Sequence, residues 1–154
     1  MRRTKKHSIT FILIPIFLCA SLVARQKKVS ELSTRHLLDS NQETELTKSI
    51  RRGKEIYTDF CMQCHLPNGQ GTPKVFPPLA GSDWLTSKRE KSIYSIKYGL
   101  NGLIKVNGLT YNSVMSPMGL EDEEIADVMN YIMNSWNNTQ KQMVTPKEVA
   151  AIKK

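Results

Sequence analysis

Residues 61–65 read Cys-Met-Gln-Cys-His (CMQCH), and this stretch decides how the rest of the chain is interpreted. Two cysteines three positions apart lie on one side of a helical turn, so their sulfurs can form thioether bonds to the two vinyl groups of one haem. His65 follows directly and is placed to bind the iron through its imidazole. With three cysteines and three histidines in 154 residues, a chance match to this motif is roughly one in a thousand. The motif therefore predicts one covalently attached haem c with its iron.

Three other uses of a CxxC pair fit the sequence less well. A zinc site needs four ligands, and beyond this motif the mature chain offers only His36. A thioredoxin-like redox motif needs a βαβ setting, whereas this motif ends a predicted helix and enters a proline-rich loop. A structural disulfide between Cys61 and Cys64 stays chemically open in an exported protein.

The iron needs a second axial ligand, or it keeps an open site. A methionine sulfur suits a low-spin electron-transfer haem. Among the methionines after the leader, two lie on the apolar stripe of the last predicted helix, one lies inside the attachment turn and one lies in the C-terminal segment. Met115 and Met118 remain, both in the loop YNSVMSPMGL at 111–120.

Apolar periodicity predicts two principal helices, one on each side of the chain's middle section. The first covers about 47–61, where Leu46, Ile50, Gly53 and Tyr57 recur at steps of three or four. The second covers about 122–135, behind four acidic residues at 121–124 whose charges favour a helix N-terminus. A mainly α fold follows.

The section between these helices is predicted as a loop, a short helix and a small hairpin. Residues 66–87 hold four prolines and three glycines, too many for a helix or a central strand. Ser87 and Glu90 form a capping-box pattern that opens a helix ending near Tyr98, before Gly99, with Ile93 and Ile96 buried. Asn107-Gly108 between alternating apolar residues predicts a hairpin over 104–111.

The N-terminal 45 residues are predicted to be an export leader and a linker. Residues 1–24 combine a basic head with a short apolar run, typical of a signal peptide cleaved after Ala24 or of an uncleaved anchor that associates with the membrane through residues 9–24. Lipidation at Cys19 is disfavoured by the bulk of Leu18. Residues 25–45 form a polar tether. The protein is therefore expected to be periplasmic or otherwise extracytoplasmic, and membrane-anchored if the leader stays.

Charge excludes nucleic acid as a partner. The chain carries 22 Lys and Arg against 14 Asp and Glu, a net charge of +8. Most of that excess lies in the leader and in residues 139–154, which we interpret as a basic tail. Residues 46–138, the predicted domain, hold ten basic and nine acidic residues. The domain therefore has no basic stripe that would follow a phosphate backbone.

Residues 46–138 resemble class I cytochromes c, especially the small bacterial single-haem members. The resemblance rests on four segments, namely CMQCH at 61–65, Gly53 to Tyr57, PPLAG at 77–81 and MSPMGLEDEEIADVMNY at 115–131. It implies the cytochrome c fold: N- and C-terminal helices that cross at Gly53, a short middle helix, a small hairpin and long loops that wrap the haem. Tyr57 and Tyr131 match the aromatic residues around that crossing.

The resemblance also implies roles for individual residues. The Pro77 carbonyl would accept from the second ring nitrogen of His65, and Leu79 would pack on the haem. Met115 holds the family position of the sixth ligand and is preferred to Met118, although the family usually has Met followed directly by Pro. Glu121 replaces the serine that commonly caps the last helix, so a weaker cap is expected.

These residues predict a carrier that passes one electron at a time between larger redox-partner proteins, and not an enzyme. Exchange is expected at the haem edge near Cys61 and Cys64, while Trp84 either packs on a propionate or fills the core. One alternative is a cytochrome subunit of a periplasmic dehydrogenase or reductase complex. Another is a haem enzyme or gas-binding protein with an open sixth site.

Overall fold

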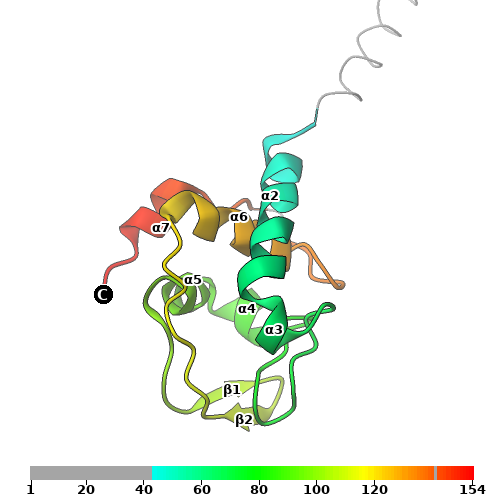
Figure 1. Cartoon of the computed structure of the whole chain (residues 1–154), viewed down its shortest axis with the longest axis vertical. Helices are drawn as coiled ribbons and strands as arrows, with labels where there is room; N and C mark the ends of the chain where they lie inside the picture. The colour runs from blue at the N-terminus through cyan, green and yellow to red at the C-terminus, as the bar shows by residue number, and fades with distance from the viewer. Residues whose placement is uncertain (1–42, 141) are drawn as a thin grey trace, which may run out of the picture. The chain divides into compact units, whose positions relative to one another are not determined.

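The computed structural model describes residues 43–140 and 142–154 of the chain. The predicted leader (1–24) and all but the end of the predicted tether (25–45) lie outside the described residues. Thr44–Lys154 form one compact unit. Among the described residues it contains six helices and one two-stranded hairpin, which confirms the mainly α fold that the sequence predicted (Figure 1).

Helix α2 (Glu45–Phe60) begins where the Thr44 side chain accepts a hydrogen bond from the Thr47 backbone N–H at 3.1 Å. It starts two residues before the predicted position because this threonine cap precedes the apolar stripe. Its buried side is formed by Ser49, Gly53 and Tyr57. Helix α3 (Met62–His65) is the single turn that carries the CMQCH motif.

Helix α6 (Asp122–Ile132) crosses α2 at Gly53, as predicted. A β-carbon at Gly53 would lie 1.9 Å from the Asp127 carbonyl oxygen, so only glycine permits this approach. Beside the crossing, the rings of Tyr57 and Tyr131 have centroids 5.4 Å apart. The predicted crossing of the two principal helices is therefore confirmed.

The start and end of α6 differ from expectation. Glu121 does not leave the helix poorly capped, because the Glu124 carboxylate accepts a hydrogen bond from the Glu121 backbone N–H at 2.8 Å, the return arm of a capping box. The helix ends at Ile132 and not near Ser135, and Trp136 and Asn137 in the turn that follows take the left-handed conformation, with φ of 50° and 68°.

The middle section contains one helix more than predicted. Helix α4 (Asp83–Ser87) lies in the stretch expected to be an extended loop, and the Ser82 hydroxyl accepts a hydrogen bond from the Leu85 N–H at 3.5 Å. Ser87 closes α4 by donating to the Asp83 carbonyl at 2.6 Å. It therefore forms no capping box with Glu90, and that prediction was wrong.

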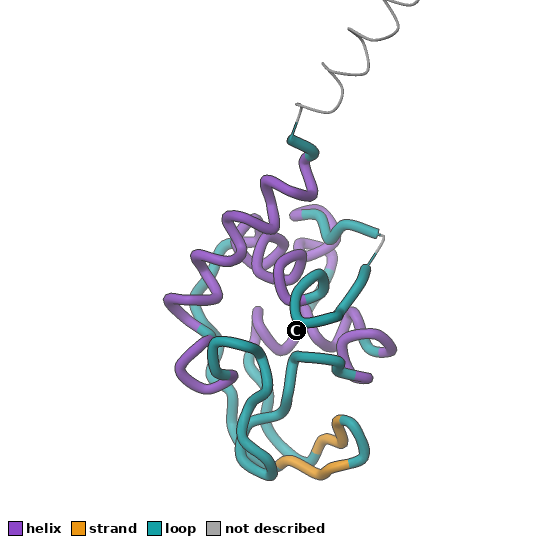
Figure 2. Tube along the Cα trace, turned by 90° about the vertical axis from the view of Figure 1, so that its right-hand side faces the viewer, coloured by secondary structure: helices purple, strands orange, loops and turns teal. Residues whose placement is uncertain are grey.

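The remaining middle elements follow the sequence prediction. Helix α5 (Arg89–Tyr98) ends at Gly99, whose φ is 84°, and its Ile93 and Ile96 are buried. Strands β1 (Ile104–Val106) and β2 (Leu109–Tyr111) pair antiparallel around Asn107-Gly108, both with positive φ. Figure 2 shows the hairpin among loops, away from the end of the unit at which α2 begins.

The C-terminal residues fold back on the domain, so their interpretation as a basic tail is wrong. Helix α7 (Pro146–Ala151) packs on α6, and Val144 and Val149 are both 0% exposed in the hydrophobic core. The backbone of Val144 is hydrogen-bonded to Asn130 on α6, and the Val149 carbonyl accepts from Lys97 of the middle section. The described domain thus extends to the C-terminus and not to residue 138.

Candidate functional site

Two adjoining cavities, of about 80 and 260 Å³, lie between the CMQCH turn and the Met115 loop. Because they share a set of lining residues, we treat them as parts of one site. The shared residues are Cys61, His65, Pro77, Leu100, Ile104 and Met115. The site therefore joins the sequence motif to residues about fifty positions further along the chain.

The two cysteines face an apolar environment. Cys61 caps the end of α2 and the start of α3, and both thiols are free and partly buried. Burial, and then the neighbouring Cys64, raise the pKa of the Cys61 thiol to about 11. The disulfide that the sequence left open is not formed. An environment that disfavours a thiolate is compatible with an uncharged thioether.

His65 is oriented by the backbone of the proline-rich loop. Its Nδ1 lies 3.0 Å from the Pro77 carbonyl oxygen, which can only accept a hydrogen bond, so Nδ1 carries the proton. The Nε2 lone pair is then left as a ligand. Burial lowers the pKa of His65, which favours the neutral ring that binds iron. This is the contact that the resemblance implied for Pro77.

The Met115 loop is held to the end of α5 by the backbone. Met115 and Leu100 exchange two N–H to carbonyl hydrogen bonds, both 2.8 Å long. A β-carbon at Gly99 would lie 2.8 Å from the Met115 carbonyl oxygen. Gly99 therefore ends α5 and also leaves the space that the Met115 loop needs to pack against it. Met115 lines both cavities, whereas Met118 lines only the larger one.

Apolar side chains from α4, α5, α6, the hairpin and the loops between them form most of the walls. Leu79 lines the smaller cavity, as the resemblance implied, and Met129, predicted to fill the core, lines it while being 0% exposed. Sequence reasoning missed Leu100, Ile104 and Tyr111, which line the site from the hairpin and the turn before it. The signal for Ile104 and Tyr111 was the alternation of apolar residues in the hairpin, which was interpreted only as secondary structure.

The donor set and the walls fit a haem c. Two free thiols, a neutral imidazole with an available Nε2 and a soft methionine sulfur border one apolar space. Within the described residues, no cluster of three or more His, Cys, Asp or Glu could hold a metal ion by itself. The zinc interpretation of the CxxC pair therefore has no support in that part of the chain.

A family model described as Cytochrome c matches residues 50–136. Cytochrome c-552 of Thermus thermophilus is 47% identical over 94 residues, which are 58% of this chain and 71% of that protein. The cytochrome c subunit of the quinone alcohol dehydrogenase of Gluconobacter oxydans is 27% identical over 104 residues, 66% of this chain and 22% of the subunit. The gluconate 2-dehydrogenase cytochrome c subunit of Pantoea cypripedii is 29% identical over 122 residues, 73% of this chain and 28% of the subunit.

Proposed function

The chain belongs to the cytochrome c family, which carries covalently bound haem c, and from this premise we propose that it is a single-haem electron carrier. The observation that carries the proposal is the hydrogen bond from His65 to the Pro77 carbonyl beside a cavity that Met115 also lines. In that arrangement His65 and Met115 of this chain would both bind the iron, so no coordination position would be kept for a substrate.

In this proposal Cys61 and Cys64 would hold the haem through thioether bonds, and His65 Nε2 and the Met115 sulfur would bind the iron. The bound haem supplies a one-electron Fe(III)/Fe(II) couple. Pro77 fixes the orientation and tautomer of His65. Leu79, Met129 and the other apolar walls exclude water, which lowers the reorganisation that accompanies a change of charge.

The larger cavity opens on the surface where we expect electrons to be exchanged. Its lining contains both cysteines and no Lys, Arg, Asp or Glu, while Phe60 (48% exposed) and Val114 (74% exposed) stand at its edge. An uncharged rim lets another protein approach the cysteine edge without desolvating ions. The partners are redox proteins, one donating and one accepting electrons.

Exchange at this rim can be measured between two copies of the haem-loaded protein. Val114→Asp places a charge at the rim and should slow electron self-exchange, measured by NMR line broadening in mixed oxidation states. Leu109→Asp is the control, because Leu109 is also an exposed apolar residue (45% exposed) but does not line the larger cavity. Equal slowing in both variants would place the exchange surface elsewhere.

A second candidate function is that of a cytochrome subunit in a dehydrogenase complex. It is favoured by the relatives from Gluconobacter oxydans and Pantoea cypripedii, which are named as such subunits. An extracytoplasmic location suits both functions. Among the described residues no helix has the length and hydropathy needed to cross a membrane. Co-purification from the native source separates the two, since a subunit elutes with a larger dehydrogenase and a free carrier elutes alone.

The sixth ligand tests the carrier proposal most directly. A methionine sulfur on low-spin ferric haem gives a weak absorption band at the red end of the spectrum. Met115→Ala should abolish this band, lower the reduction potential and open the iron to carbon monoxide. Met118→Ala is the control and should keep the band. If the unmodified protein lacks the band and binds carbon monoxide readily, an open-site haem protein replaces the carrier.

Haem attachment is tested separately. The protein should hold one haem that acid and organic solvent do not extract, and Cys61→Ala or Cys64→Ala should leave one thioether at most. Zinc in place of iron would contradict the proposed site residues.

A further inference from the structure

A groove of about 690 Å³ adjoins the haem site on a side different from the cysteine edge. It is bordered by α5, by the turn that leads into β1 and by the C-terminal residues after α7. Four of its lining residues, Trp84, Ser95, Leu100 and Ile104, also line the smaller haem cavity. The groove and that cavity are therefore neighbours that share these four side chains.

The groove and the cysteine edge differ in charge. The lining of the groove includes two cations, Lys91 on α5 and Lys153 near the C-terminus, together with Glu90 and the Tyr94 hydroxyl. In contrast, the larger cavity around Cys61 and Cys64 is lined by no ionisable side chain besides those two cysteines, His65 and Tyr111. The site thus has an uncharged end and an end with a net cationic lining.

A haem has the same asymmetry. Its two vinyl groups lie on one part of the ring edge, and its two propionates, which are ionised at neutral pH, project from another part. If Cys61 and Cys64 hold the vinyl edge, the propionate edge would be directed away from the cysteines, toward the rest of the cavity. This step depends on the proposed thioether attachment.

We propose that the groove receives the haem propionates and that Lys91 and Lys153 are their charge partners. Two anionic groups in a mostly apolar cavity need cations or hydrogen-bond donors at the point where they emerge. The cations of the groove, with the Tyr94 hydroxyl and the indole of Trp84, are the donors that border it. Glu90 partly offsets their charge, so both lysines are needed for a net positive groove.

Lys153 can act in this way because the chain around it is fixed to α5. The Lys97 ammonium donates to the Val149 carbonyl at 2.9 Å, and the Tyr98 hydroxyl donates to the Ile152 carbonyl at 3.0 Å. Residue 153 lies beyond the segment that the family model matches. The C-terminal segment would therefore complete the haem site of this chain.

The reduction potential of the haem-loaded protein tests this proposal. A cation beside the propionates stabilises the reduced haem, which carries one positive charge fewer than the oxidised form. Lys91→Gln and Lys153→Gln should each lower the potential, shifting the equilibrium with a reference one-electron couple about two- to fivefold, as expected for a partly screened charge. Glu90→Gln should shift the equilibrium in the opposite direction.

Lys147→Gln is the matched control, because it removes the same charge from exposed α7 at a position that does not line the groove. It should leave the potential unchanged. Equal shifts for Lys147, Lys91 and Lys153 would show a net-charge effect, and no shift for Lys91 and Lys153 would place the propionates elsewhere. Either result overturns the proposal.

Haem content is measured first, from the absorption of the alkaline pyridine adduct. Its absence in the unmodified protein would contradict the proposed function, whereas normal content with unshifted potentials contradicts only the role of the groove.

Discussion

Helix α6 is held by two neighbours in two different ways. Against α2 the contact is between backbones, at a glycine. Against the C-terminal segment 142–154 the contact is made by valines and by polar side chains that bind backbone groups. The difference teaches that a close helix crossing is visible in a sequence as a glycine within an apolar stripe, whereas polar anchoring of a short segment leaves no such pattern.

The α2–α6 contact depends on the shape of the backbone. Gly53 lies against the backbone carbonyl of Asp127. The side-chain carboxylate of Asp127 accepts hydrogen bonds from the Ser49 hydroxyl at 2.6 Å and from the guanidinium of Arg52. No side chain can be added at Gly53 without moving one helix away from the other.

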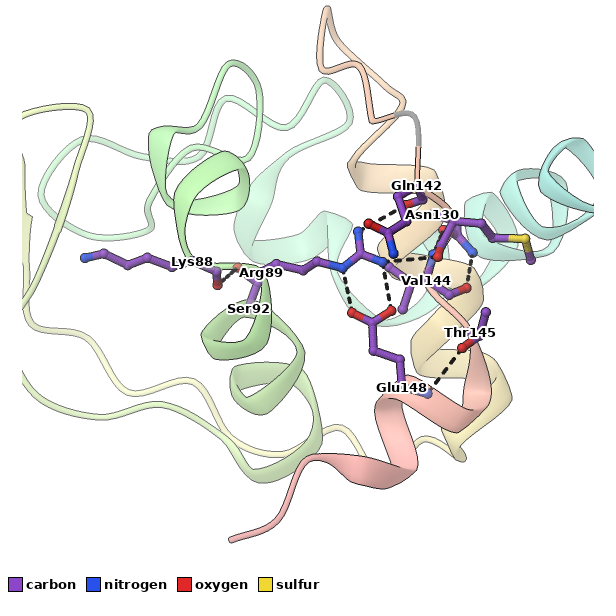
Figure 3. Close-up of polar contacts among 9 residues, drawn as sticks. Lys88, Arg89, Ser92, Asn130, Gln142, Val144, Thr145 and Glu148 are labelled. Atoms are coloured by element: carbon purple, nitrogen blue, oxygen red, sulfur yellow. Dashed lines mark hydrogen bonds and ion pairs between the residues drawn. The ribbon is translucent and has the colours of Figure 1, made fainter.

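The C-terminal segment depends on specific polar partners. Asn130 on α6 donates to the Val144 carbonyl at 2.9 Å and accepts from the Val144 N–H at 2.7 Å, and so satisfies both backbone groups of a buried residue. Arg89 on α5 forms two hydrogen bonds to the Glu148 carboxylate, at 2.6 and 2.8 Å (Figure 3). Val144 and Val149 can enter the core because these groups are paired.

The largest expected effect is that of Gly53→Val. Its side chain would overlap the Asp127 carbonyl, and the helices would have to separate, at a cost of about 4 kcal/mol or more in the free energy of unfolding. Chemical denaturation of the haem-loaded protein measures this cost. Lys54→Val, at the exposed neighbouring position, is the control and should cost about 0.5 kcal/mol. Similar stability in both variants would show that the crossing tolerates side chains.

Asn130→Ala should have the next largest effect. The substitution removes the Asn130 side chain that is hydrogen-bonded to the buried backbone N–H and carbonyl of Val144 and to the Ser49 hydroxyl. It should lower the free energy of unfolding by about 3 kcal/mol. Asn134→Ala is the control, because its contacts lie in a half-buried turn open to water, and should cost about 1 kcal/mol. If Asn130→Ala costs no more than the control, polar anchoring does not hold the segment.

Val149→Ala measures what the segment contributes by packing. Removing two buried methyl groups should cost about 2 kcal/mol in the free energy of unfolding. The same substitution at Val114, which is 74% exposed, should change stability by less than about 0.5 kcal/mol. A negligible cost at Val149 would mean that α7 is only loosely attached in solution.

The smallest effect concerns the Arg89–Glu148 pair and pH. Arg89 holds the pKa of Glu148 below the 4.5 of a free glutamate, mainly through its hydrogen bonds, while burial acts in the opposite direction. Since the folded pKa is lowered, the pair contributes stability above about pH 4.5 and loses it as the pH falls through the lowered pKa. Glu148→Gln should therefore cost up to about 1 kcal/mol at pH 7 and less at pH 3, measured by urea denaturation. An equal cost at both pH values would rule out the ionised pair.

Much of the haem site could be predicted from the sequence because its chemistry is concentrated in short segments. The spacing of Cys61, Cys64 and His65 belongs to one helical turn, and Asn107-Gly108 specifies its hairpin by backbone conformation alone. The apolar stripes of α2 and α6 are local in the same sense. The resemblance then related Pro77 to His65, and their 3.0 Å contact confirms that geometry.

The sequence by itself thus determined the attachment turn, the principal helices and the hairpin, because each depends on residues within a few positions of one another, while the crossing at Gly53 was implied by the resemblance. Only the tertiary structure decided that Leu100 pairs with Met115 and that Val144 and Val149 belong to the core. Those features depend on partners far away in the chain, such as Asn130 for Val144. Two valines five positions apart in a basic segment show no helical or strand periodicity. Their burial is favourable only where the folded domain supplies both an apolar surface for the side chains and hydrogen-bond partners for their backbone groups.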